Sequence, residues 1–228
     1  MVNPPNCNGC RRCFVDCPYG AIAMLPHPDK PGHELARVLP ELCASCGICA
    51  GACPSSTPFR SVEQLVTGID MPQQPIGALR QDMARRIAAL TGPVKIAVFG
   101  CECAAGAGAV EDQGTAVMNL MCTGLLPPSF VEYALRGGAD GVLVTGCREG
   151  SCAYRFGTQW TEQRLAGQRE PHLRPGVPAE RLRIAWADRH EMSDLKAALD
   201  DFRENLKNLD ADEKRLRPYT PRRIAKHG

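Results

Sequence analysis

The 13 cysteines of this 228-residue chain are the residues whose type and spacing point most directly to chemistry. Eight of them form two runs with one spacing, Cys-x2-Cys-x2-Cys-x3-Cys-Pro. The first run extends from Cys7 to Cys17-Pro18 and the second from Cys43 to Cys53-Pro54. Two-residue gaps allow three thiolates to wrap one [4Fe–4S] cluster, whereas the longer gap and the proline turn the fourth sulfur away.

Because the fourth cysteine of each run serves the other cluster, the repeat predicts two exchanged ligand sets. We expect one cluster on Cys7, Cys10, Cys13 and Cys53, and the other on Cys43, Cys46, Cys49 and Cys17. Zinc is the alternative, but structural zinc sites use two separated ligand pairs. Residues 1–60 resemble the two-cluster bacterial ferredoxins. We therefore expect an α+β ferredoxin-like module, with short strands at 21–25 and 38–39.

Residues 61–93 are predicted to be a linker with a helix. A Pro- and Gln-rich stretch, 71–75, precedes apolar residues that recur at helical spacing from Leu79 to Leu90. This amphipathic helix is expected to cover the next domain, and the surface of a partner protein is the other place where it could lie.

From residue 94 to residue 209, apolar strand patterns alternate with helical patterns. Strands are predicted at 94–99, 116–121, 141–145 and 183–187. Ser129-Phe-Val-Glu132 predicts a capping box at the start of a helix that Gly137-Gly138 ends. The last helix places five apolar residues on one face, namely Leu195, Leu199, Phe202, Leu206 and Leu209. The alternation predicts an α/β domain with a parallel sheet of about four strands, covered on both faces.

The other five cysteines follow the first three predicted strands of this domain. They are Cys101 and Cys103 after the first strand, Cys122 after the second, and Cys147 and Cys152 after the third. Ligands of open parallel sheets bind outside the carboxyl ends of the strands, so we expect these thiols at one edge. Four thiolates suffice for a [2Fe–2S] cluster, and the fifth would be a spare or a neighbour that tunes the site. Simple buried cysteines, a redox-active dithiol and zinc are the alternatives.

Two arginines, Arg148 and Arg155, lie beside the last of these cysteines in the sequence. Positive charge close to a cluster raises its reduction potential, so we expect these side chains to tune the site.

The same region resembles the delta subunit of methyl-viologen-reducing hydrogenase. The resemblance is carried by Met121-Cys122-Thr-Gly124, Phe130, residues 138–142, the segment from Gly146-Cys147 through Gly150-Ser-Cys152-Ala-Tyr154, and Gly157. It implies one [2Fe–2S] cluster, and electron transfer between a hydrogenase or dehydrogenase and the flavoprotein of a heterodisulfide-reductase-type complex. The family's first cysteine group usually reads Cys-Cys-x-x-Cys, whereas this chain has Cys101-Glu102-Cys103, so which of these two is a ligand stays open.

The leading hypothesis is a non-catalytic electron-transfer subunit that relays electrons between partner redox subunits. A ferredoxin-fed disulfide reductase, with the late cysteines as a redox dithiol, is the alternative, and a redox-sensing regulator ranks third because the chain has no DNA-reading motif. No dinucleotide fingerprint is present. With no signal peptide and no apolar run of roughly 18 residues, we expect a cytoplasmic protein that reaches a membrane only through partners. The basic tail, 210–228, is predicted to be solvated or to dock onto an acidic partner or anionic lipid.

Overall fold

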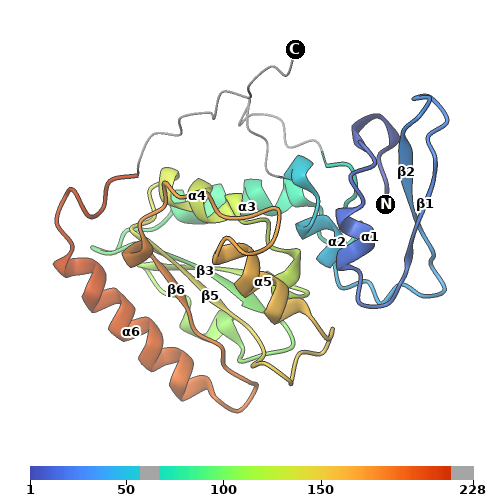
Figure 1. Ribbon diagram of the computed structural model, residues 1–228. Coiled ribbons are helices and arrows are strands. Elements are labelled where there is room, and N and C mark those ends of the chain that lie inside the picture. Colours follow the sequence, from blue (N-terminus) through green and yellow to red (C-terminus); the bar gives the residue numbers. More distant parts are fainter. Residues whose placement is uncertain (57–66, 217–228) are drawn as a thin grey trace.

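The computed structural model describes residues 1–56 and 67–216. A cysteine-rich amino-terminal unit lies at one end of the molecule and an α/β unit at the other (Figure 1). This arrangement confirms the predicted fold class, a small ferredoxin-like module followed by an α/β domain with a parallel sheet. Residues 57–66, at the end of the predicted module and the start of the predicted linker, lie outside the described residues, as does most of the basic tail, 217–228.

The amino-terminal unit contains an antiparallel hairpin and two short helices. Strand β1 (Ile22–Pro26) pairs with β2 (Glu34–Val38). Helices α1 (Arg12–Asp16) and α2 (Ile48–Gly51) each lie inside one cysteine run. The first strand was predicted within one residue, but the second begins earlier than the prediction of 38–39. Glu34 and Arg37 interrupt the apolar residues of β2, so the sequence pattern shows only its end. The pairing with β1 defines the rest of the strand.

The segment that follows the undescribed stretch returns to the amino terminus. Val2 and Ile69 form an isolated antiparallel bridge, and the Asn3 amide donates to the Gly68 carbonyl at 2.9 Å. The Asp70 carboxylate then accepts a hydrogen bond from the Ile76 amide at 3.0 Å, at the start of the next helix. This segment therefore links the hairpin unit to the helix of the α/β unit.

The sheet of the α/β unit has four parallel strands in the order β4-β3-β5-β6. Their bounds are Ile96–Cys101 for β3, Thr115–Leu120 for β4, Gly141–Thr145 for β5 and Leu182–Ile184 for β6. The four predicted strands are present, and β6 is shorter than predicted. Because β3 is central, its carboxyl end has a neighbouring strand end on each side.

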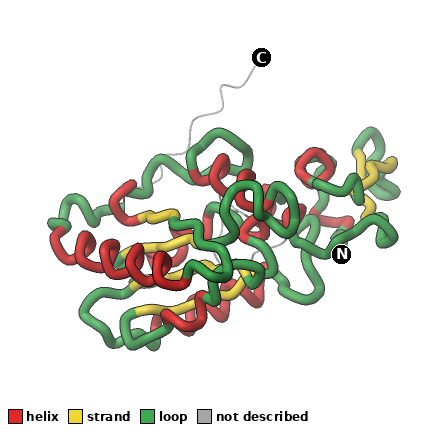
Figure 2. The backbone as a smooth tube through the Cα atoms, turned by 90° about the horizontal axis from the view of Figure 1, so that it is seen from below, coloured by secondary structure: helices red, strands yellow, loops and turns green. Residues whose placement is uncertain are grey.

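Helices cover both faces of this sheet (Figures 1 and 2). Helices α3 (Ile76–Ala88) and α4 (Ser129–Arg136) pack on one face around Phe99, Phe130 and Met83. Helix α6 (Met192–Asn208) packs its apolar stripe, including Leu199 and Phe202, on the other face. Helix α5 (Gly157–Leu165) follows the last cysteine loop and lies toward the amino-terminal unit. The amphipathic helix of the predicted linker, α3, thus covers the sheet.

The predicted capping box at the start of α4 is wrong. Ser129 is the first residue of the helix, Pro128 occupies the cap position, and no side chain caps this end. Glu132 instead accepts from Arg136 one turn later, at 2.9 Å. A proline immediately before the helix already sets a helical backbone angle, so the start needs no serine cap. The predicted end at Gly137 and Gly138 is correct, with Gly138 at φ +105°.

Candidate iron–sulfur sites

The two cysteine runs of the amino-terminal unit have the same backbone conformation. The second residue after the first cysteine has positive φ in both runs, at Gly9 (+70°) and Ser45 (+55°). The fourth residue does too, at Arg11 (+62°) and Gly47 (+78°). Each run uses one glycine and one other residue, so the left-handed turns are a property of the loop and not only of glycine. Left-handed turns at the same two positions suit repeated ligation of similar clusters.

The first predicted ligand set comes together at one end of this unit. Cys7, Cys10, Cys13 and Cys53 all line one small cavity of about 20 Å³. Burial, together with the neighbouring sulfurs of Cys10, Cys53 and Cys7, raises the pKa of Cys13 to about 12. Without metal this thiol is therefore neutral at ordinary pH, and metal binding has to displace its proton.

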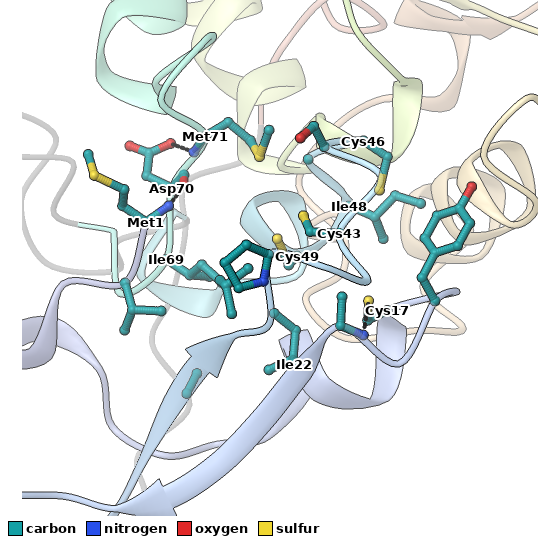
Figure 3. Close-up of a pocket in the computed structure, with 18 of the residues that line it drawn as sticks. Met1, Cys17, Ile22, Cys43, Cys46, Ile48, Cys49, Ile69, Asp70 and Met71 are labelled. Atoms are coloured by element: carbon teal, nitrogen blue, oxygen red, sulfur yellow. Dashed lines mark hydrogen bonds between the residues drawn. The ribbon is translucent and has the colours of Figure 1, made fainter.

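The second predicted set surrounds a larger cavity of about 640 Å³ (Figure 3). Cys17 reaches it from the first run, and Cys43, Cys46 and Cys49 from the second. Burial raises the pKa of Cys46 to about 11, although the Ile48 amide lowers it, and burial also raises the pKa of Cys49. The Ala21 amide donates to the Cys17 sulfur at 3.3 Å. The four thiols around one cavity and an amide directed at sulfur suit a [4Fe–4S] cluster.

The five late cysteines meet at the carboxyl edge of the parallel sheet, as the strand ends predict. Cys101 is the last residue of β3 and packs with Ala104 and Cys147. Cys103 and Cys152 lie against this cluster. The Cys101 side chain hydrogen-bonds with that of Cys147, and burial raises the pKa of Cys101 to about 12. Cys101, Cys122 and Cys147 are buried, whereas Cys103 and Cys152 are partly exposed.

A second thiol pair, Cys122 and Cys152, completes this group. Cys122 donates a hydrogen bond to Cys152, which holds the pKa of Cys152 at about 5 and raises the pKa of Cys122. The Gly124 amide donates to the Cys122 sulfur at 3.4 Å. Gly157, at the start of α5, lies against both sulfurs, because a Cβ there would stand 2.1 Å from Cys122 Sγ and 3.3 Å from Cys152 Sγ. Only a glycine allows the helix to begin so close to the thiols.

The two arginines that were expected to tune this group lie in different surroundings. Arg148 is exposed and pairs with Glu191 at 2.6 Å and with Asp194 at 3.4 Å, so carboxylates balance its charge. Arg155 reaches the amino-terminal unit, where it donates to the Pro18 carbonyl at 3.0 Å and lies over the Tyr19 ring.

Within the described residues, no three His, Cys, Asp or Glu side chains converge as ligands of a single metal ion would. The iron–sulfur interpretation therefore rests on the cysteine spacing, the grouping of the thiols and the family comparison.

Sequence reasoning missed a buried ion-pair network beside these sites. Asp16 precedes Cys17 and pairs with Arg164 of α5 at 2.6 Å and also with Arg169. Asp16 and Arg164 are both almost completely buried, and the Trp160 indole donates to the Asp16 carbonyl at 3.1 Å. Partners 148 residues apart leave no local pattern, so the sequence held no signal that could reveal this pair.

Comparison with known proteins identifies both units. The profile of the methyl-viologen-reducing hydrogenase delta subunit matches residues 95–210, about half of the chain. This chain belongs to the methyl-viologen-reducing hydrogenase delta-subunit family. A 4Fe-4S dicluster domain profile matches residues 6–57, which supports two [4Fe–4S] clusters in the amino-terminal unit of this family member. The resemblances expected from the sequence are confirmed.

Curated relatives of this delta-subunit family member come from two kinds of complex. The iron-sulfur subunit of an F420-non-reducing hydrogenase from Archaeoglobus profundus is 33% identical over 103 residues, which are 45% of this chain and 70% of the relative. The corresponding vhc iron-sulfur protein from Methanococcus voltae is 29% identical over 41% of this chain and 65% of its own length. One subunit of the ferredoxin/F420H2-dependent CoB-CoM heterodisulfide reductase from Methanosarcina acetivorans is 34% identical over 93 residues. The match covers 41% of this chain but only 12% of that reductase polypeptide.

Proposed function

We propose that this chain is an electron-relay subunit that holds two [4Fe–4S] clusters and one [2Fe–2S] cluster and passes electrons between redox partners. Four late cysteines form one cluster and the fifth, Cys122, joins it by a hydrogen bond with Cys152. This grouping at one sheet edge, in a domain of the delta-subunit family, is the observation that carries the proposal. When bound, iron–sulfur clusters supply reversible one-electron chemistry. The protein supplies thiolate ligands, amides directed at sulfur and a packed surrounding.

The ligand sets follow from the grouping of the thiols. We propose Cys7, Cys10, Cys13 and Cys53 for the first [4Fe–4S] cluster, and Cys17, Cys43, Cys46 and Cys49 for the second. For the [2Fe–2S] cluster we propose the two contacting pairs, Cys101 with Cys147 and Cys122 with Cys152. Cys103 is then the spare, since it belongs to neither pair.

Partner subunits carry out the substrate chemistry in this proposal. The relatives are named as subunits of a hydrogenase and of a heterodisulfide reductase, so a flavoprotein or an iron–sulfur protein of such a complex is the expected partner. None of the helices in the described parts of the chain has the length and apolarity for a bilayer crossing. We propose a cytoplasmic location, with any membrane attachment made through partners.

One observation favours a second candidate function, a ferredoxin-fed disulfide reductase. The hydrogen bond from Cys122 keeps the pKa of Cys152 at about 5, and a thiolate beside a thiol is the arrangement of redox-active dithiols. In that case the five late cysteines hold no iron, and electrons from the amino-terminal clusters reduce a disulfide.

Iron content and electron paramagnetic resonance separate the two candidates. A relay with three clusters predicts roughly ten irons per chain and a [2Fe–2S] signal in the reduced protein, whereas a ferredoxin with a dithiol predicts roughly eight irons. Protein purified without oxygen from its native host is the sample of choice, because co-purifying subunits then identify the partner complex. Eight irons with no [2Fe–2S] signal in fully loaded protein would contradict the relay.

A further inference from the structure

The cysteine loops of the two units meet at a close backbone contact. Gly51, at the end of α2, lies against the 3-10 turn η4 (Thr123–Leu125), where a Cβ on Gly51 would stand 2.1 Å from the Gly124 carbonyl oxygen. A Cβ on Gly124 would in turn stand 2.6 Å from the Ile48 side chain. Both loops thus have glycine where they touch, which indicates a fixed contact and not a loose tether.

A single buried arginine, Arg164 of α5, joins the loops at this contact. Its guanidinium donates to the Asp16 carboxylate at 2.6 Å, to the Gly124 carbonyl at 2.8 Å and to the Ile48 carbonyl at 3.5 Å. Each acceptor is close in sequence to a proposed ligand. Asp16 precedes Cys17, Ile48 lies between Cys46 and Cys49, and Gly124 follows Cys122 by two residues.

The space between the second [4Fe–4S] site and the five-cysteine site is filled by protein. Cys46 and Cys122 belong to one packed apolar cluster with Ile48, and the rings of Tyr19, Tyr154 and Trp160 lie against it. In contrast, Cys10 of the first site is exposed, and no cysteine of that site belongs to this packed cluster.

We propose that the second [4Fe–4S] cluster exchanges electrons directly with the [2Fe–2S] cluster, and that Arg164 is the positioning residue that fixes the distance between them. The inference rests on the function proposed above. One electron leaves the reduced [4Fe–4S] cluster, which becomes oxidised, and enters the oxidised [2Fe–2S] cluster, which becomes reduced. No bond breaks and no proton moves. The three clusters thus act in the order first [4Fe–4S], second [4Fe–4S], [2Fe–2S], in either direction of flow.

The test is the magnetic interaction between the two neighbouring clusters in the intact, cluster-loaded protein. A reduced [4Fe–4S] cluster near the [2Fe–2S] cluster speeds the relaxation of the [2Fe–2S] signal, which microwave-power saturation measures. We expect this enhancement in the wild-type protein. It should fall markedly in Arg164→Met at unchanged iron content, and Arg164→Lys should restore part of it. Gly51→Ala should also reduce it, because the added methyl group forces the two loops apart.

Arg181→Met is the matched control. Arg181 is also a buried arginine of the α/β unit and donates to the Asp140 and Ala139 carbonyls at 2.7 Å, away from the cysteines. We expect it to leave the enhancement unchanged.

Two results would overturn the inference while leaving the relay intact. One is a wild-type protein with about ten irons and a [2Fe–2S] signal but no relaxation enhancement. The other is an Arg164→Met variant that loads fully and keeps the wild-type enhancement. If Arg164→Met does not fold, the wild-type measurement and the Gly51→Ala variant still decide the question. A wild-type protein with about eight irons and no [2Fe–2S] signal would contradict the relay itself.

Discussion

At the scale of single residues, the environment of each thiol decides how it behaves before metal arrives. Burial raises the pKa of Cys13 and Cys101 to about 12, whereas the hydrogen bond from Cys122 holds the pKa of Cys152 at about 5. At neutral pH, Cys152 is therefore a thiolate, and the buried thiols still carry their protons. If this group holds iron as proposed, Cys152 can bind it without first losing a proton, because the thiolate is the form that binds metal.

These pKa values predict that cluster loading weakens as the pH falls. A thiol whose pKa lies above the ambient pH must lose its proton to bind iron, so acid competes with iron at Cys13, Cys46 and Cys101. Reconstitution with ferrous iron and sulfide between about pH 6 and 9 should give a rising iron content, and a pH-stat should record proton release. Loading that is independent of pH would contradict these environments.

The late cysteines allow a test of the proposed ligands one residue at a time. Cys103→Ser should keep the [2Fe–2S] signal and roughly ten irons, because Cys103 lies outside the two contacting pairs. Cys101→Ser should lose that signal and fall to roughly eight irons, because it removes a buried ligand. Iron analysis and paramagnetic resonance of the two variants provide the measurement. The reverse result would make Cys103 the ligand.

At the scale of elements, strand ends and one helix start bring the late thiols together. Strands β3, β4 and β5 are parallel neighbours, so their carboxyl ends present Cys101, Cys122 and Cys147 at one edge. Helix α5 starts directly against this group, at Gly157. The Thr158 hydroxyl, in the first turn of α5, donates to the Cys147 carbonyl at 2.9 Å and ties the helix to the loop.

Because α5 begins against the sulfurs of Cys122 and Cys152, Gly157→Ala should affect the proposed [2Fe–2S] site and not the [4Fe–4S] sites. The added methyl group would overlap Cys122 Sγ, so the variant should lose the [2Fe–2S] signal and roughly two irons while it keeps both [4Fe–4S] clusters. Gly77→Ala is the control, since a Cβ at Gly77 of α3 has no neighbour within 4 Å. It should leave all three clusters in place. Equal iron content in the two variants would show that the helix start does not shape the site.

At the scale of the whole molecule, an ion-pair network joins the two units. Asp16 of the amino-terminal unit is buried against Arg164 and Arg169 of the α/β unit, and Arg169 also lies over the Trp160 ring at 3.4 Å. On the same side of the molecule, Arg12 pairs with Glu170 at 3.0 Å. A buried carboxylate that loses a partner is costly, so this network resists separation of the units.

This network predicts that Arg164→Met lowers stability as well as cluster coupling. Breaking a buried pair costs about 3–5 kcal/mol, with the lower value expected because Arg169 still pairs with Asp16. The temperature at which cluster absorbance is lost should fall on the order of 10 °C for a chain of this size. Arg183→Met removes an exposed pair with Asp201 and should cost about 1 kcal/mol or less. Equal shifts in the two variants would contradict a special role for the buried network.

Local spacing determined the two-cluster character of the amino-terminal unit and the fold class. Cysteine gaps of two and three residues set ligand geometry within one loop, and apolar runs of four to six residues mark strands of a parallel sheet whose ends collect the late cysteines. How the amino-terminal unit and the α/β unit contact each other was decided only by the tertiary structure. Asp16 and Arg164 are 148 residues apart, and the contact of Gly51 with Gly124 joins two separately coded loops. Such contacts follow from shape and buried charge, which no periodic pattern along the chain encodes.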